Sequence, residues 1–208
     1  MLARLFVLLP FNVVVPEGQE FPVYEYGDDG YKVRVYPPVR SGRPTSLDSP
    51  DHIEIDGMAA FQADTLRIDF WREMFDRRKD GPCDPPEDVI RRSVNWFLTR
   101  LRYVTRAAQV RPLDFLLVNW RIRYFNDDET ELKVDENLVR GRGGITFSFG
   151  WIALNRTVWE DIHSLPVNYD PPPWDGLLLD AFYELPSIGP AVVLASTSLE
   201  VFIAHMLV

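Results

Sequence analysis

The chain has 208 residues and a formal net charge of −9, with 31 acidic and 22 basic side chains. This length is enough for one large or two small domains with a hydrophobic core, and the acidic balance argues against wholesale binding to nucleic acid. The single cysteine, Cys83, excludes an internal disulfide and is typical of a protein from a reducing cytoplasm. Seventeen prolines predict long, stiff connections between the elements.

The first 36 residues are predicted to form strands. The apolar run over residues 1–16 imitates a signal peptide, but Pro10 interrupts it and no small-residue cleavage site follows. We therefore expect a buried strand bent at Pro10, with a secretory signal as the alternative. Residues 23–36 alternate in polarity around a Gly-Asp-Asp-Gly turn, which predicts a β-hairpin. Further alternating strands are predicted over 53–55 and 63–71.

A proline-rich loop is predicted over residues 37–52. Loops of this length in compact domains are usually either mobile or functional. Asp48, Asp51 and His52 within it carry donor atoms that metals accept, but a hard cation needs several more ligands. A solvated loop is therefore the preferred interpretation of this stretch.

A long amphipathic helix is predicted over Asp84–Val110. Asp84 can cap it, Glu87 lies three residues after the cap, and the proline at 112 ends it because the residue before a proline is pushed out of the helical region. Apolar residues recur on one face at spacings of three and four, as packing on a sheet requires. They are Ile90, Val94, Phe97, Leu101, Val104 and Ala108.

The opposite face of this helix carries basic and aromatic side chains, a combination that can pair phosphates and stack on bases. The candidates are Arg92, Trp96, Arg102, Tyr103 and Arg106, joined by Arg140 and Arg142 from the glycine-rich stretch 140–144. In the alternative interpretation, the arginine stems cover neighbouring surface while Trp96 and Tyr103 pack under a loop. The glycine-rich stretch lacks the Lys-Ser/Thr pair of a phosphate loop, so a flexible turn is predicted there.

A second hairpin is predicted from residues 115–125 and 131–134. The acids of Asp127–Glu131 at its tip form the densest acidic cluster of the chain. Paired carboxylates can perform acid–base chemistry or hold Mg²⁺, although on a hairpin tip they usually only increase solubility. A strand over 145–152 and a short helix over 155–163, capped by its first residue, an asparagine, complete this part.

Three consecutive prolines predict a semi-rigid spacer over 167–173. This spacer is expected to separate an α+β domain, residues 1–166, from a helical hairpin, residues 174–208. The first helix is predicted over 174–185, and the residues expected on its buried side are Leu177, Leu178, Ala181 and Phe182. The second, over 191–208, is apolar nearly all round, which predicts that it is buried or bound to a partner.

The last helix is too polar in its middle to be a good membrane span. Glu200 lies among Leu199, Phe202 and Ile203, where an unpaired buried carboxylate would cost about 3–5 kcal/mol. We therefore expect an ion pair from another subunit or domain and predict these four residues as an interface. The helix reaches Val208 without a cap or a polar tail, which predicts either a longer protein or completion by a second subunit.

The helical corner 186–190 and the run Ala191-x-x-Leu194-x-x-Thr197-x-Leu199-Glu200-x-Phe202 resemble the opening helices of HEPN-like domains. These domains occur in bacterial defence and toxin–antitoxin proteins. The resemblance covers residues 174–208 and none of residues 1–170. It implies RNA cleavage through an Arg-x4–6-His motif on a later helix, but His205 has no arginine at that distance before it. The resemblance therefore implies that the catalytic half is absent from this chain.

These observations predict an α+β fold, with a mostly antiparallel sheet packed by one long helix and followed by a C-terminal helical hairpin. The first functional hypothesis is a non-enzymatic, cytoplasmic binding or sensing module from a defence-type protein, with no membrane partner, cofactor or metal. It is expected to form a homo-oligomer, or to join a further domain, through the 187–208 helix. The alternatives are a nucleic-acid or nucleotide-binding protein using Arg91–Arg111 and a metal-dependent hydrolase using Asp127–Glu131.

Overall fold

The computed structural model describes residues 1–40, 53–55, 57–73, 85–114, 118–132, 140–142 and 150–207. The strands in these ranges are β1 (Leu2–Pro16), β2 (Tyr24–Asp28), β3 (Tyr31–Val35), β4 (Ile53–Ile55), β5 (Met58–Trp71), β6 (Trp120–Phe125), β7 (Arg140–Arg142) and β8 (Trp151–Ala153). The helices in them are α1 (Glu87–Thr105), α2 (Arg156–Ser164), α3 (Pro173–Tyr183) and α4 (Ile188–Met206).

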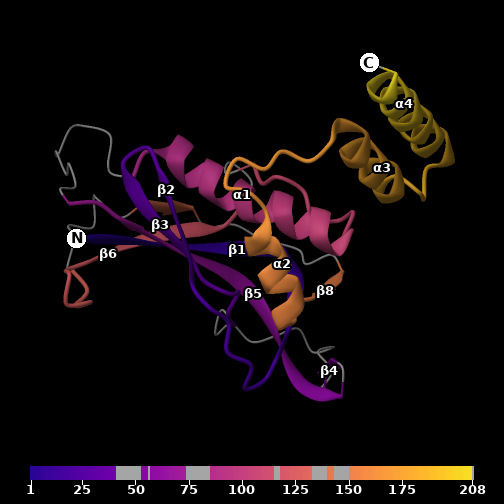
Figure 1. Ribbon diagram of the computed structural model, residues 1–208. Coiled ribbons are helices and arrows are strands. Elements are labelled where there is room, and N and C mark those ends of the chain that lie inside the picture. Colours follow the sequence, from indigo (N-terminus) through magenta and orange to yellow (C-terminus); the bar gives the residue numbers. More distant parts are fainter. Residues whose placement is uncertain are drawn as a thin grey trace.

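These strands form one sheet with the order β2-β3-β5-β1-β6-β7, while β4 pairs with β5 and β8 pairs with β1. Neighbouring strands run antiparallel except β8, which runs parallel to β1. Strands joined by hairpins, with one long helix on the sheet and a helix pair at the end, make the fold α+β, as predicted (Figure 1).

Strand β1 is the centre of the sheet. It pairs with β5 on one side and with β6 and β8 on the other. The predicted buried strand is confirmed as β1, one strand of 15 residues, and its pairing with β5 shifts register between Leu8 and Val13, around the position where the bend was predicted. Proline has no N–H to donate, so a bulged position is where a central strand tolerates it.

The first predicted hairpin is confirmed. Strands β2 and β3 pair from Tyr24↔Val35 to Asp28↔Tyr31. Asp29 and Gly30 lie in the turn with φ of 48° and 79°, a left-handed conformation that aspartate tolerates and glycine adopts freely.

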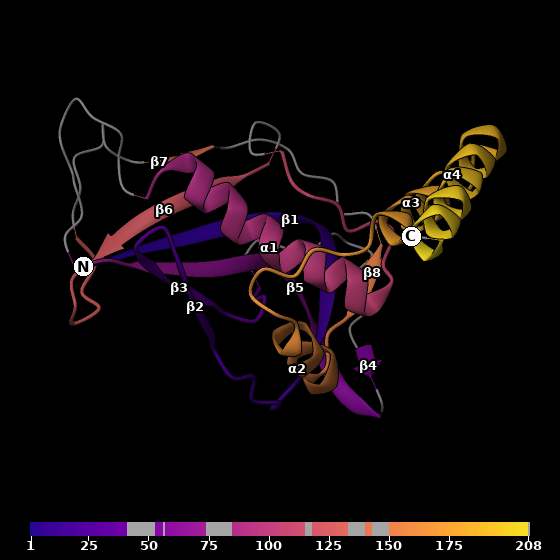
Figure 2. The same ribbon diagram turned by 45° about the horizontal axis from the view of Figure 1, so that its top comes forward.

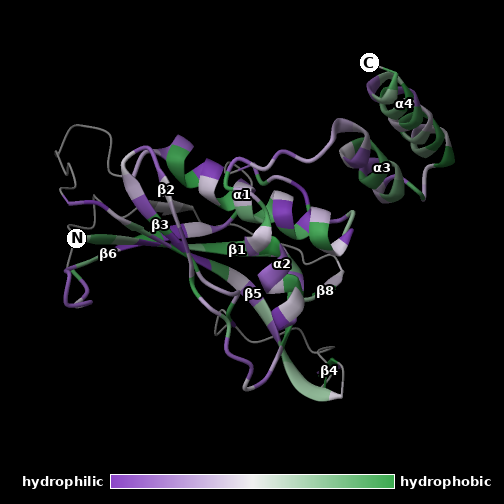
Figure 3. Cartoon of the chain, viewed as in Figure 1, coloured by the Kyte–Doolittle hydropathy of each residue, from purple (hydrophilic) through white to green (hydrophobic). Residues whose placement is uncertain are grey.

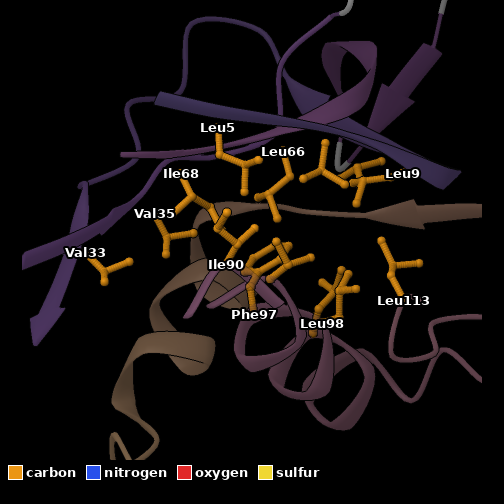
Figure 4. Packing of buried hydrophobic residues seen from close by; sticks show 14 of the residues in the cluster. Leu5, Leu9, Val33, Val35, Leu66, Ile68, Ile90, Phe97, Leu98 and Leu113 are labelled. Carbon is orange, nitrogen blue, oxygen red and sulfur yellow. The ribbon is translucent and has the colours of Figure 1, made fainter. Parts of the chain in front are cut away.

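The hydrophobic core lies between the sheet and α1. Alternate residues of the central strands, such as Leu5 and Ile68, are fully buried and face Ile90, Phe97 and Leu98 of the helix (Figure 4). The predicted apolar face is therefore correct for the helix as far as Leu101, whereas Val104 is half-buried and Ala108 lies beyond the helix end.

Helix α1 is shorter than the predicted span of 84–110. It begins at Glu87, because Pro86 is extended, with φ −60° and ψ 152°, and serves as the N-cap residue. Asp84, the predicted cap, lies outside the described residues. The helix ends at Thr105 because Arg106 adopts a left-handed conformation, φ 56°, five residues before the predicted stop.

The prediction of a flexible turn over 140–144 is wrong for Arg140–Arg142, which form the edge strand β7 beside β6. Gly141 makes this pairing feasible, since a Cβ atom there would lie 2.8 Å from the carbonyl oxygen of Trp120. In the second predicted hairpin, β6 and its turn are present, and Phe125 forms a β-bridge with Glu131. The Leu132 amide donates to the Tyr124 carbonyl at 2.8 Å, and residues 133 and 134 of the predicted return strand lie outside the described residues.

Helix α2 begins as predicted, because the Asn155 side chain accepts a hydrogen bond of 2.9 Å from the amide of Val158. Helices α1 and α2 lie together on one face of the sheet, whereas α3 and α4 form a hairpin that extends away from it (Figures 1 and 2). Ser187 is the N-cap residue of α4 but makes no capping hydrogen bond through its side chain.

Candidate functional site

The predicted arginine face of α1 lies against carboxylates of the same chain. Arg92 donates to Asp88 at 2.7 Å and to Asp28 at 3.3 Å. Arg102 is 2.6 Å from the Oδ1 atom of Asp180 on α3. The arginines at these positions are therefore engaged in intramolecular ion pairs.

The same pattern continues past the end of α1. Arg106 forms an ion pair with Asp175, and Arg111 lies 3.1 Å from Asp180. Although burial raises the pKa of Asp180, hydrogen bonds from Arg102 and Arg111 hold it below its ordinary value. These contacts attach α3 to the C-terminal part of α1, so the basic face serves at least as the docking surface of the hairpin.

Trp96 packs under the segment that joins α2 to α3. Its indole ring stacks on Tyr24 and Tyr26, with centroid distances of 4.9 and 4.6 Å, and its Nε1–H donates to the Val167 carbonyl at 2.9 Å. Tyr103 likewise contacts Tyr169, at 5.1 Å between ring centroids. This arrangement corresponds to the alternative interpretation, in which the aromatic residues of this face pack under a loop.

Arg100 is a buried residue of α1 that the sequence analysis did not single out. It is 1% exposed, its guanidinium lies 3.8 Å from the Trp96 ring centroid, and it donates to the carbonyls of Pro166 and Val167. His163 stacks on Tyr24 in the same cluster, at 4.3 Å. Burial, together with the positive charge of Arg100, lowers the pKa of His163 to about 4, so this imidazole is neutral at pH 7.

Arg140 and Arg142, the other predicted anion-binding residues, lie on the edge strand β7. Their backbones pair with Ile122 and Trp120 of β6. The structure thus places the backbones of both residues at an edge of the sheet, on the strand beside β6.

Each described acid of the turn after β6 has a partner of its own. The pairs are Asp127 with the Met1 amine at 2.5 Å, Asp128 with Thr130, Glu129 with Arg4 at 3.8 Å and Glu131 with Arg123 at 3.3 Å. The hydrogen bond from the Met1 amine lowers the pKa of Asp127. Among the described residues, no group of three or more His, Cys, Asp or Glu side chains is arranged to hold a metal. Asp48, Asp51, His52 and Cys83 lie outside them.

Most apolar side chains of the α3–α4 hairpin are exposed. Figure 3 shows by colour the hydrophobic residues along both helices. The prediction that Leu178 and Phe182 are buried is wrong, because they are 39% and 55% exposed, whereas Ala181 is buried. Between the two helices lies an apolar groove of about 230 Å³. Its lining residues are Leu178, Ala181, Phe182, Leu185, Ile188, Ala191, Val192 and Ala195.

Three of the four predicted interface residues of α4, Leu199, Phe202 and Ile203, are 58%, 40% and 46% exposed. Glu200 is exposed as well, and no ion pair among the described residues includes it. The predicted partner of this carboxylate is therefore not among the residues that the structure describes. Among the described helices, α4 alone is long and apolar enough to cross a bilayer. Its mean hydropathy is 1.5, and 11% of the stretch is buried within the protein.

The face of the sheet opposite α1 carries no helix in the described part of the chain (Figure 2). The strand register places charged and aromatic residues on this face in two transverse rows. One row is Tyr36, Arg67, Phe6 and Arg121, and the other is Glu25, Arg34, Asp69, Arg4 and Arg123. We call these two rows, together with Lys32 and Trp71, which lie opposite each other, the open face.

Asp69 is the buried centre of the open face. It is 1% exposed and accepts hydrogen bonds from Arg4 at 2.9 and 3.0 Å and from Arg67 at 3.1 and 2.6 Å. The Arg67 guanidinium also lies 3.8 Å from the centroid of the Tyr36 ring. Two guanidinium groups therefore share one carboxylate.

The open face cannot be recognised in the sequence because its residues come from five strands. Alternation in β5 and β6 indicates that Arg67, Asp69, Arg121 and Arg123 lie opposite the apolar face, but only the strand order and register bring them together. No family model matches the chain, and no curated protein or solved structure is detectably similar to it. The functional argument therefore depends on the physical properties of these surfaces.

Proposed function

We propose that the protein is a non-enzymatic binding module that forms a homo-oligomer through the α3–α4 hairpin. The observation that carries this proposal is the amount of apolar surface that the hairpin leaves in water. The α+β body would then be the recognition part of each subunit, and the hairpin would join the subunits.

The exposed apolar area of the hairpin is that of an interface. Eleven large apolar residues of α3, α4 and the corner between them are 39–74% exposed, including Tyr183 and Val193. The other nine are Leu178, Phe182, Leu185, Ile188, Val192, Leu199, Phe202, Ile203 and Met206. At roughly 200 Å² for each whole residue, they leave on the order of 900 Å² of exposed surface. The largest apolar patch of a typical monomer is about 300–600 Å², whereas a stable interface buries about 800 Å² from each partner.

The pattern of these residues on α4 fits a helical partner. Apolar residues recur at spacings of four and three along one exposed stripe, as in helices that pack at small crossing angles. The stripe consists of Ile188, Val192, Ala195, Leu199, Phe202 and Met206. Small alanines in the groove beside it allow close approach of another helix. Two hairpins that pack groove to groove would form a four-helix bundle.

The opposite side of α4 distinguishes a protein partner from a lipid one. Thr197 and Glu200 are exposed there, whereas a helix surrounded by lipid would be apolar on all sides. This supports a second copy of the hairpin as the occupant of the groove. Bilayer insertion is the competing outcome of the test.

Light scattering on the purified chain without detergent tests the proposal. We expect a mass of at least twice 24.1 kDa, and a shift to 24.1 kDa in the Val192→Glu variant, whose charge would enter the groove. Val193→Glu is the matched control, because Val193 is similarly exposed, at 64% against 57%, but does not line the groove. A monomeric wild-type protein, or a chain that remains soluble only with detergent or vesicles, would contradict the proposal.

The relation of residues 174–208 to HEPN-like domains stays a prediction, as do a role in bacterial defence and the cytoplasmic location. The proposed association does not depend on them, since it follows from the exposed surface of α3 and α4. The nucleic-acid hypothesis for the arginine face of α1 and the hydrolase hypothesis are not carried forward, because the described arginines and carboxylates concerned are engaged in intramolecular contacts.

A further inference from the structure

The open face combines an excess of positive charge with aromatic rings. Six cations point away from the core on β1, β3, β5 and β6, at positions 4, 32, 34, 67, 121 and 123. The acids that pair with them in the described residues are Glu25, Asp69, Glu131 and, at 3.8 Å, Glu129. The face is therefore locally positive, although the whole chain carries a net charge of −9.

The distribution of these charges leaves cations available to an anionic ligand. Lys32 and Arg34 share Glu25, with distances of 2.7 and 2.8 Å. Arg121 is exposed and forms no ion pair with the described residues, and its guanidinium lies 5.3 Å from the centroid of the Phe6 ring. The excess positive charge is therefore distributed over several strands of the open face.

Two features hold the cations of the open face in place. Arg67 stacks on Tyr36 and donates to the buried carboxylate of Asp69, which fixes the plane of its guanidinium. The strands themselves position Arg67 and Arg121 on either side of Phe6 in one row. Groups already held in this way lose little conformational freedom when they bind a ligand.

Trp71 adds an exposed ring at the end of β5. It is 43% exposed and lies opposite Lys32 on β3 and Leu2 on β1. A positively charged surface that follows a sugar–phosphate backbone, with aromatic side chains on which unpaired bases stack, is the general mode of single-strand binding. Open antiparallel sheets with exposed aromatics bind single-stranded RNA in this manner.

We propose that the open face binds single-stranded nucleic acid, with a phosphate on Arg121 and a base on Trp71. A single strand is favoured over a duplex because the bases must be unpaired to reach an aromatic ring on a flat sheet. A single strand is also favoured over an acidic peptide. The carboxylates of a peptide would pair with the cations but would leave the Trp71 ring without a stacking partner. The inference rests on the proposed function in that it gives the binding module a ligand.

Fluorescence anisotropy with a labelled uridine oligonucleotide of about twelve residues tests the inference. We expect binding at about 50 mM salt that weakens as salt rises, because the strand releases counterions at each phosphate contact. Arg121→Glu should weaken binding about tenfold, and Trp71→Ala should weaken it about fivefold. Both side chains are exposed, so neither change removes a core contact.

Arg156→Glu is the matched control for Arg121→Glu. Arg156 is exposed on α2, away from the open face, and the substitution changes the charge by the same amount. Its binding should equal that of the wild-type protein. The inference is overturned if the oligonucleotide does not bind at low salt, if Arg156→Glu and Arg121→Glu weaken binding equally, or if a glutamate peptide of equal charge competes as well as the oligonucleotide. Light scattering measures the oligomeric mass separately. A failure of the self-association proposal can therefore be distinguished from a failure of nucleic-acid binding.

Discussion

Arg100 shows how the body of this protein accommodates a buried cation. Its guanidinium reaches the carbonyls of Pro166 and Val167, just beyond the C-terminal end of α2, and covers the Trp96 ring. Hydrogen bonds to these backbone carbonyl oxygens offset part of the cost of burying the charge of the guanidinium. Arg100 therefore joins α1, α2 and the following segment through one side chain.

The pKa of His163 predicts a dependence of stability on pH. Because the folded-state pKa, about 4, lies below the ordinary value of 6.5, the unfolded chain binds a proton between these values that the folded chain does not. The free energy of unfolding should therefore decrease as pH falls from 6.5 to 4, by about 2 kcal/mol after allowance for partial solvent exposure.

Urea denaturation of the wild-type protein and of His163→Phe checks this prediction at pH 7 and at about pH 4.5. Phenylalanine keeps a ring against Tyr24 but cannot take up a proton. Carboxylates titrate in both proteins, so the expected result is a smaller loss of stability in the variant. An equal loss in both proteins would show that His163 does not carry the effect.

At the scale of elements, the sequence predicts most helices and strands but not their ends. The interior of α1 follows from apolar periodicity, whereas its last turn depends on Arg106, whose left-handed conformation is accompanied by an ion pair with Asp175. A contact between residues 69 positions apart has no local signal in the sequence. Strand β7 was missed for a related reason, since its pairing with β6 depends on the close approach at Gly141.

The attachment of α3 to α1 yields a second prediction. Asp180 receives hydrogen bonds from Arg102 and Arg111, and it is partly exposed. The Asp180→Asn variant should retain the fold. The free energy that holds α3 against α1 should decrease by about 1 kcal/mol, which corresponds to roughly fivefold faster local opening of α3. Hydrogen exchange of the backbone amides in α3 measures this opening.

The control for this prediction is Asp161→Asn on α2. Asp161 is exposed and forms no ion pair with the described residues, so the exchange of α3 should match the wild-type protein. Equal exchange in the two variants would mean that apolar packing, and not these ion pairs, holds the hairpin against the body.

At the scale of the whole molecule, the candidate surfaces were predicted unevenly. The apolar character of α4 was visible in the sequence because it depends on one continuous stretch, and candidate interface residues could be named from it. The open face was not visible in the sequence, because Arg67 and Arg121 become neighbours of Phe6 only through the strand register. The basic face of α1 was recognised, but its partners, Asp175 and Asp180, lie on an element about 70 residues later.

Self-association through α3 and α4 would couple stability to concentration. A protein that is stabilised by association melts at a higher temperature as its concentration rises, because mass action favours the oligomer. We expect this rise for the wild-type protein and for Val193→Glu, and its absence for Val192→Glu. Differential scanning calorimetry over about a hundredfold range of concentration measures it. A melting temperature independent of concentration in all three proteins would show that no association accompanies folding.

The central place of β1 also sets the order in which the protein can fold during synthesis. This strand ends at Pro16, but its partners β6 and β8 begin at Trp120 and Trp151. At about 5–20 residues per second, the ribosome completes these partners on the order of ten seconds after β1 has been made. During that interval the apolar residues of β1 lack half of their sheet. The nascent chain is therefore expected to need a chaperone until residue 153 has emerged, and the refolding of the full chain is expected to be slow, as for other proteins with distant strand pairings.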